Sequence, residues 1–215
     1  CSSPKHEPMP LVKFTPSMEV TEVWSKGLSS AEGFLVPAVY DDMVFAAGGK
    51  TLTRLNARTG ETEWSVSFNS PITGGVGSDG YVTAVGLWDG NLEVVDAEGK
   101  VSWEKKLTTE LASPPVVSHG LVIARTMDTR VSAFEASSGE LQWTYQRSQP
   151  ALTVRLPTRM LAHDNFLLVG QPNGHIVILD IASGKPMFEF QVAQAKGVTE
   201  VERLVDVVGA PAFSD

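Results

Sequence analysis

The sequence predicts an all-β protein, a β-propeller built of four-stranded antiparallel blades. Tryptophan recurs at positions 24, 64, 103 and 143, with spacings of 40, 39 and 40 residues, and Phe188 follows 45 residues later. Each of the last four aromatic residues ends a similar phrase, and a period near 40 residues with β-rich sequence inside it is typical of propeller blades. The phrases are LNARTGETEW (55–64), VDAEGKVSW (95–103), FEASSGELQW (134–143) and LDIASGKPMF (179–188).

Three segments of each repeat read as short β-strands that precede the aromatic phrase. The first is brief and apolar, and a two-residue turn of Gly, Asp, Asn or His leads to a second, β-rich run. A hairpin then leads to the third strand. First strands are expected at 37–40, 114–118 and 160–163, second strands at 43–48, 81–86, 121–126 and 166–170, and third strands at 51–57, 91–97, 130–136 and 175–181.

The turns and the fourth strand complete the blade. Asp89-Gly90 and Asn173-Gly174 predict hairpins with type I′ turns, which require positive φ. A Thr-Gly or Ser-Gly turn then leads to the fourth strand, which carries the tryptophan. Since the second and third strands are apolar on both faces, each blade is expected to be sandwiched between neighbours. The recurrent tryptophans are therefore expected to be buried between blades rather than to stack on a ligand.

The two ends of the chain do not contain complete repeats. Residues around Trp24 resemble only a fourth strand, and GAPAFSD (209–215) resembles only a first strand. We therefore expect residues 21–215 to form a partial propeller, roughly the first half of a longer ring. Open blade faces would favour self-association. Complete blades are expected at about 35–68, 72–107, 111–147 and 156–192.

Composition excludes two classes of partner or location. The formal net charge of −8 and the pI of about 5.0 argue against nucleic-acid binding, which needs a basic surface. No apolar run is long enough to span a membrane as a helix, which takes about 18 residues or more. The 42% hydrophobic and 20% charged residues fit a folded globular chain.

The single cysteine is residue 1, and no initiator Met precedes it. This pattern is typical of a bacterial lipoprotein whose signal peptide has been removed and whose Cys1 carries lipid. Residues 1–20 are rich in Pro and Ser and are expected to be a flexible tether. Ser2, in place of Asp, favours the outer membrane in the bacterial sorting rule. The alternative is that Cys1 only marks where this stretch of sequence begins.

Catalytic motifs are not found. The four histidines are scattered without metal-site spacing, and there is no G-x-S-x-G nucleophile turn. Gly49-Lys50-Thr51 imitates the end of a phosphate-binding loop, but Val44 stands where that loop needs Gly, and the repeat places Gly49 in a hairpin. The sequence therefore predicts no enzyme activity, no metal and no small-molecule substrate. The histidines are His6, His119, His163 and His175.

Two connectors between blades are longer than the others. From the blade-ending aromatic residue to the next first strand, the chain takes 17 residues after Trp143 and 23 after Phe188, against 13 after Trp24 and 12 after Trp103. Both long connectors, 145–159 and 191–210, leave equivalent strand ends and should emerge on one face. Each mixes apolar residues with Arg, which is typical of protein-binding loops. The alternative is that they only fill gaps between blades.

The repeat phrase resembles the tryptophan-docking repeat of quinoprotein alcohol dehydrogenases, through Ala57, Thr59, Gly60 and Trp64. Those enzymes hold pyrroloquinoline quinone (PQQ) over a vicinal disulfide, with a calcium ion. This sequence has no second Cys, so the repeat predicts the scaffold without the cofactor. A PQQ-dependent oxidoreductase remains the alternative function.

A closer resemblance covers the whole chain. The N-terminal Cys, the repeat phrase, PALTVR (150–155) and QAKGVTEVERLVDV (194–207) are similar to the BamB family of lipoprotein propellers. The resemblance implies an eight-bladed ring, a non-enzymatic scaffold without cofactor, and a place on the periplasmic side of the outer membrane. It also implies that the chain binds the POTRA domains of BamA in the outer-membrane β-barrel assembly (BAM) complex.

The same resemblance implies which residues bind the partner. Leu152 and Arg155 match the family's Leu-x-Leu-Arg stretch, and Val154 is a conservative departure. Asp206 matches the first residue of an Asp-x-Asp pair, whereas Val208 stands in place of the second. We expect Leu152, Val154, Arg155, Arg203 and Asp206 to form one accessible patch on the face of the long connectors.

Overall fold

The predicted all-β fold is confirmed by a computed structural model, which describes residues 22–28, 35–147, 159–171 and 174–191. The strands form four separate sheets of four antiparallel strands, and strands that are consecutive within a sheet are hydrogen-bonded neighbours. The described residues contain no α-helix. These sheets are the blades of a partial propeller, and we number them 1 to 4 in chain order.

Each blade begins with its innermost strand and ends with its outermost one. Blade 1 contains β1 (Ala38–Tyr40), β2 (Met43–Gly48), β3 (Thr51–Asn56) and β4 (Thr62–Ser67), and blade 2 contains β5 (Ile72–Ser78), β6 (Thr83–Leu87), β7 (Asn91–Val95) and β8 (Val101–Lys106). Blade 3 contains β9 (Val116–Ser118), β10 (Leu121–Arg125), β11 (Val131–Glu135) and β12 (Leu141–Tyr145), and blade 4 contains β13 (Leu161–His163), β14 (Phe166–Gln171), β15 (His175–Asp180) and β16 (Pro186–Gln191).

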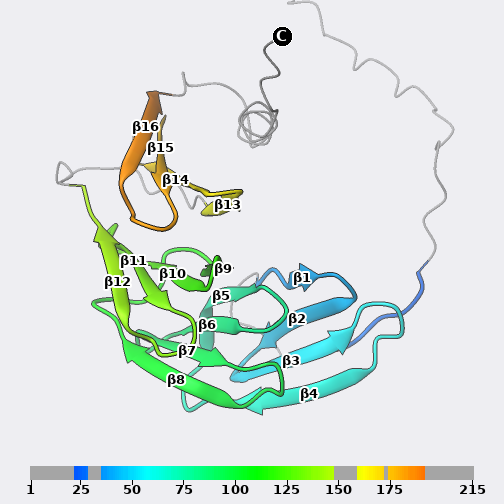
Figure 1. Cartoon of the computed structure of the whole chain (residues 1–215). Coiled ribbons are helices and arrows are strands. Elements are labelled where there is room, and N and C mark those ends of the chain that lie inside the picture. The colour runs from blue at the N-terminus through cyan, green and yellow to red at the C-terminus, as the bar shows by residue number, and fades with distance from the viewer. Residues whose placement is uncertain (1–21, 29–34, 148–158, 172–173, 192–215) are drawn as a thin grey trace, which may run out of the picture.

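The blades follow one another along an arc, with β1 and β9 toward its inside and β4, β8 and β12 on its outside (Figure 1). A separate apolar core fills each space between neighbouring blades. Phe45 and Val85 belong to the core between blades 1 and 2, and Val94 and Phe134 to the next. Since both faces of a central blade are covered, β6 and β10 are buried along their whole length, which explains their continuous apolar sequence.

Each recurrent tryptophan contacts the blade that follows it along the chain. Each indole Nε1 donates a hydrogen bond to a backbone carbonyl in the phrase that follows it. The predicted burial is confirmed for Trp143, which is 8% exposed, but the other three are only half-buried. The bonds run from Trp24 to Ala57 (2.8 Å), Trp64 to Ala97 (2.9 Å), Trp103 to Ala136 (2.8 Å) and Trp143 to Ile181 (2.8 Å).

A glycine in the following blade makes room for each indole. At Gly139, φ is +73°, and a Cβ atom would lie 2.7 Å from Cδ2 of Trp103. Any side chain would therefore meet both the backbone strain of the left-handed region and the ring. We call this pairing of indole, carbonyl and glycine the Trp–Gly dock. The receiving glycines are Gly60, Gly99, Gly139 and Gly184.

The hairpin at Asp89-Gly90 forms, but the predicted type I′ turn is wrong. Only Gly90 has positive φ (84°), and its N–H donates to the carbonyl of Leu87 at 3.0 Å. Strands β6 and β7 are joined by three residues, and a loop of that length takes an ordinary turn followed by one left-handed residue. A pair of positive φ values is found instead at His119 (54°) and Gly120 (72°), between β9 and β10.

One cross-strand pair departs from its repeats. Thr53 and Ser65 of blade 1 lie opposite each other with their hydroxyl oxygens 3.2 Å apart, but the matching pair of blade 2 is Glu93 opposite Glu104. Glu93 is buried, and burial together with the facing Glu104 carboxylate raises the pKa of Glu93 to about 7. The carboxyl group of Glu93 is therefore partly protonated near neutral pH.

Candidate functional site

One face of the arc gathers the hairpins between second and third strands and the connectors between blades. Backbone hydrogen bonds tie the two kinds of loop together, from Phe68 to Lys50 (2.9 Å) and from Leu107 to Gly90 (3.0 Å). We call this side the connector face, defined by hairpins 49–50, 88–90 and 127–129 and connectors 68–71 and 107–115. In the described blades, connectors from equivalent strand ends thus share a face.

The predicted partner-binding residues lie outside the described residues. Leu152, Val154 and Arg155 fall within 148–158, and Arg203 and Asp206 fall within 192–215. Cys1, the expected lipidation site, also lies outside. The patch that these residues were expected to form therefore stays a prediction. The described residues do define where the first long connector leaves blade 3 and where it enters blade 4.

The first long connector leaves blade 3 beside the hairpin of that blade. Gln146 receives a hydrogen bond from Nη2 of Arg130 at 3.3 Å and donates one from Nε2 to the carbonyl of Asp128 at 3.2 Å. At the other end, Arg159 is exposed, whereas Met160 is 4% exposed and packs into the core between blades 3 and 4. Both ends of the connector are thus anchored.

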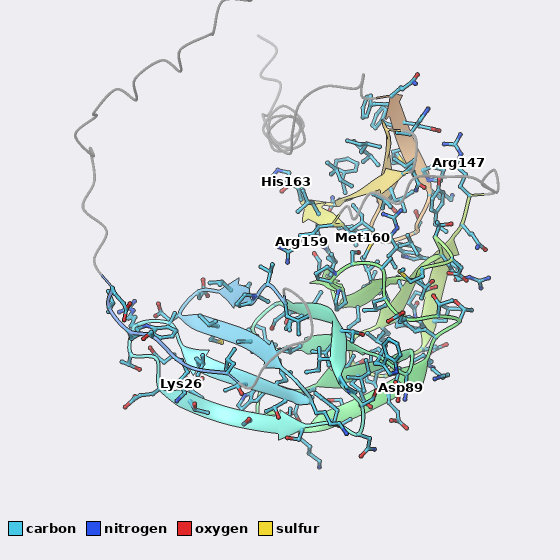
Figure 2. All side chains as sticks on the ribbon, turned by 180° about the vertical axis from the view of Figure 1, so that it is seen from behind. Lys26, Asp89, Arg147, Arg159, Met160 and His163 are labelled. Carbon is cyan, nitrogen blue, oxygen red and sulfur yellow. The ribbon has the colours of Figure 1, made fainter. Side chains whose placement is uncertain are left out.

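Arg147, labelled in Figure 2, belongs to an exposed charged cluster that links blades 3 and 4 at the start of this connector. Arg147 forms an ion pair with Oε1 of Glu189, and the same oxygen lies 3.1 Å from Nδ1 of His175. Hydrogen bonding from Arg147, with a smaller contribution from His175, lowers the pKa of Glu189 below its ordinary value. Because these side chains are exposed, water screens the cluster, which positions the connector more than it stabilises the fold.

Buried polar side chains mark the same end of blades 3 and 4. Arg125 ends β10 and Gln171 ends β14, and each is 6% exposed. Burial lowers the pKa of the Arg125 guanidinium from its ordinary value. The N–H of Ala112, in the connector from blade 2, donates to the carbonyl of Arg125 at 2.8 Å. Both buried side chains thus lie at the strand end that meets the connector face.

The described part of the chain contains no group of three or more His, Cys, Asp or Glu side chains placed to hold a metal ion. Gly49 and Lys50 form the hairpin between β2 and β3, as predicted, so the imitation of a phosphate-binding loop precedes a strand and not a helix. Among the described residues, no helix has the length and apolar character needed to cross a membrane.

Sequence reasoning missed one feature of the connector face. Trp88 and Met127 are large apolar side chains that are 65% and 36% exposed. Trp88 is the one tryptophan of the chain's five that does not fit the 40-residue spacing. Its position outside the repeat was the signal in the sequence that could have singled out Trp88.

The fold and the Trp–Gly docks define a β-propeller protein of the tryptophan-docking class, with its loops and anchored connectors gathered on one face. A model of the family described as outer membrane protein assembly factor BamB matches residues 48–215. The chain belongs to this family.

Individual proteins give the same assignment. An outer membrane protein assembly factor BamB from Burkholderia pseudomallei is 39% identical over 217 residues, which cover 98% of this chain and 57% of that protein. The crystal structure of BamB from Moraxella catarrhalis has a TM-score of 0.65 at 28% identity, covering 78% of this chain and 52% of that one. The chain thus spans about half the length of the relatives it matches.

A more distant likeness concerns the fold alone. Quinohemoprotein alcohol dehydrogenase from Comamonas testosteroni has a TM-score of 0.58 at 20% identity, over 76% of this chain and 35% of that enzyme. It shares the propeller architecture that the repeat phrase predicts. At this identity the match carries no statement about cofactor or reaction.

Proposed function

We propose that this chain is part of a non-enzymatic scaffold lipoprotein of the BAM complex. In this proposal it lies on the periplasmic side of the outer membrane of a Gram-negative bacterium, anchored by lipid on Cys1. It binds the POTRA domains of BamA and assists the folding and insertion of outer-membrane proteins. The observation that carries the proposal is the family match over 48–215, which includes both long connectors.

The physical character of the connector face supports a protein partner. Its loops are held by backbone and side-chain hydrogen bonds, so little ordering entropy is lost on binding. Leu152 and Val154 would supply apolar contact, and Arg155 offers five donors for a carboxylate or carbonyl on the partner. Arg203 and Asp206 would extend the polar rim from the second long connector. An apolar patch with a central Arg is the usual composition of a binding hot spot.

The test is the affinity of the protein for the BamA POTRA domains after Arg155→Glu. A hot-spot Arg contributes about 2 kcal/mol or more, so we expect an affinity loss of about thirtyfold or greater. Arg58→Glu is the matched control, because Arg58 is a highly exposed Arg in the β3–β4 hairpin, on the opposite face. Circular dichroism checks the fold of both variants. Unchanged affinity of Arg155→Glu would contradict the assignment of this connector.

Two experiments test the proposed lipid anchor on Cys1. Mass spectrometry of the protein from membranes should show a diacylglycerol and an acyl chain on Cys1, and Cys1→Ser should release the protein from the membrane. An unmodified Cys1 in membrane-associated protein would contradict this part of the proposal.

A further inference from the structure

The connector face carries a preformed pocket between blades 2 and 3, with a volume of about 550 Å³. It is lined by the hairpin 88–90 of blade 2, by residues 106–110 that lead to the next blade, and by Met127 in the hairpin of blade 3. Asp89, labelled in Figure 2, stands on its rim. All of its lining residues lie within the described part of the chain, and nothing in the repeat phrase requires the pocket.

The pocket is held open by hydrogen bonds between its walls. The N–H of Leu107 donates to the carbonyl of Gly90 at 3.0 Å, and Nζ of Lys106 donates to the carbonyl of Asp89. On the other side, the N–H of Met127 donates to Oγ1 of Thr109 at 2.8 Å. Because both hairpins are fixed to one connector, a ligand would find the site already formed.

The lining combines apolar groups with two carboxylates, those of Asp89 and Glu110, and one ammonium group, that of Lys106, which is held on the carbonyl of Asp89. The exposed indole of Trp88 and thioether of Met127 give a large, adaptable apolar contact. The carboxylate of Asp89 accepts from its own neighbour Asn91, but that of Glu110 has no hydrogen-bond or ion-pair partner among the described residues. Such a site fits an apolar side chain with a cation beside it, which pairs with Glu110 and packs over the indole face.

We propose that this pocket, which we call the Trp88 pocket, is a second protein-docking site, and that it receives an apolar side chain flanked by Lys or Arg. The occupant is a segment of the same partner that the first long connector binds, so this inference rests on the proposed function. The first long connector and the pocket are adjacent. Gln146, where that connector starts, donates a hydrogen bond to the carbonyl of Asp128, in the hairpin whose Met127 lines the pocket. One partner surface can therefore cover both.

The test compares the affinity for the BamA POTRA domains of Trp88→Ala, Glu110→Lys and Arg155→Glu. We expect Trp88→Ala to weaken binding about tenfold or more, as for a hot-spot aromatic residue. Glu110→Lys should weaken it severalfold, more at low ionic strength than at high, because it reverses a rim charge. Tyr81→Ala is the control, since Tyr81 is 74% exposed in the β5–β6 turn on the opposite face, and it should leave affinity unchanged.

The outcomes separate the two proposals. If Arg155→Glu weakens binding and Trp88→Ala does not, the Trp88 pocket is overturned and the proposed function stands. If neither variant changes the affinity, both are overturned. If Tyr81→Ala weakens binding as much as Trp88→Ala, the loss of affinity does not depend on which face carries the aromatic residue, and the proposal of the Trp88 pocket is again overturned. A basic-to-acidic substitution on the partner that restores the affinity of Glu110→Lys would support the predicted charge pairing directly.

Discussion

Two glycines with nearly the same positive φ allow the contribution of the Trp–Gly dock to stability to be measured. Gly139 has φ +73° and lies against the ring of Trp103, and a Cβ there would be 2.7 Å from Cδ2. Gly120 has φ +72°, and a Cβ there would meet nothing within 4 Å. Gly120→Ala therefore reports backbone strain alone, whereas Gly139→Ala reports the same strain and the loss of the dock.

The expected costs follow from these contacts. Strain from Ala in the left-handed region is about 1 kcal/mol at either position. At Gly139 the indole must also move, which breaks the bond from Nε1 to the carbonyl of Ala136, worth about 1 kcal/mol. Lost packing of the half-buried ring adds about 1 to 2 kcal/mol. We therefore expect about 1 kcal/mol for Gly120→Ala and about 3 to 4 kcal/mol for Gly139→Ala.

Urea denaturation followed by tryptophan fluorescence gives the free energy of unfolding of each variant. The difference between the two variants is the decisive quantity, since the backbone strain cancels. Equal destabilisation by the two substitutions would refute the dock as a source of stability. A Gly139→Ala variant whose unfolding is no longer a single transition would show instead that the dock couples blades 2 and 3.

Two further predictions concern single groups. Glu93→Gln should make stability less dependent on pH, because the pKa of Glu93 is raised from its ordinary 4.5 to about 7 in the folded protein. The unfolded state therefore releases this proton at a lower pH than the folded state. The stabilisation that comes from protonated Glu93 is complete below pH 4.5 and is lost as the pH rises through about 7, which lowers the free energy of unfolding by about 2 to 3 kcal/mol. Urea titrations at pH 5 and 8 should show this loss in wild type and not in the variant. Trp143→Phe removes the donor to the carbonyl of Ile181 and should cost about 2 kcal/mol in the same assay; no change would mean that the bond contributes nothing.

The repeat carried most of the fold information. A tryptophan every 40 residues, together with Thr-Gly or Ser-Gly turns, was enough to predict four strands per blade and their order. These signals are local, because each hairpin is specified by its own turn and by apolar residues on both strand faces. The receiving glycines belong to the same phrase, and the structure shows that their role is to admit the indole of the preceding blade.

Features set by strand register, by strand ends or by contacts between blades could not be predicted. The glutamate pair lies within blade 2, but Glu93 and Glu104 are brought together only by the register of β7 and β8. The type of turn at Asp89-Gly90 was wrong because loop length, set by where β6 ends, decides it. The Trp88 pocket needs loops from two blades, and only the position of Trp88 outside the repeat hinted at it.

The Trp–Gly dock gives the chain a direction of assembly. Every indole precedes the carbonyl that receives it, by 33 residues in three docks and 38 in the fourth. If the chain becomes available for folding from its N-terminus, the indole of each dock is present before the turn that carries its carbonyl acceptor. Blades can then be added one at a time, because each blade contacts only its neighbours, as in other repeat proteins, and needs no contact with residues far along the chain. Each added blade covers the apolar face of the blade before it, so that one blade face at a time stays open at the growing end.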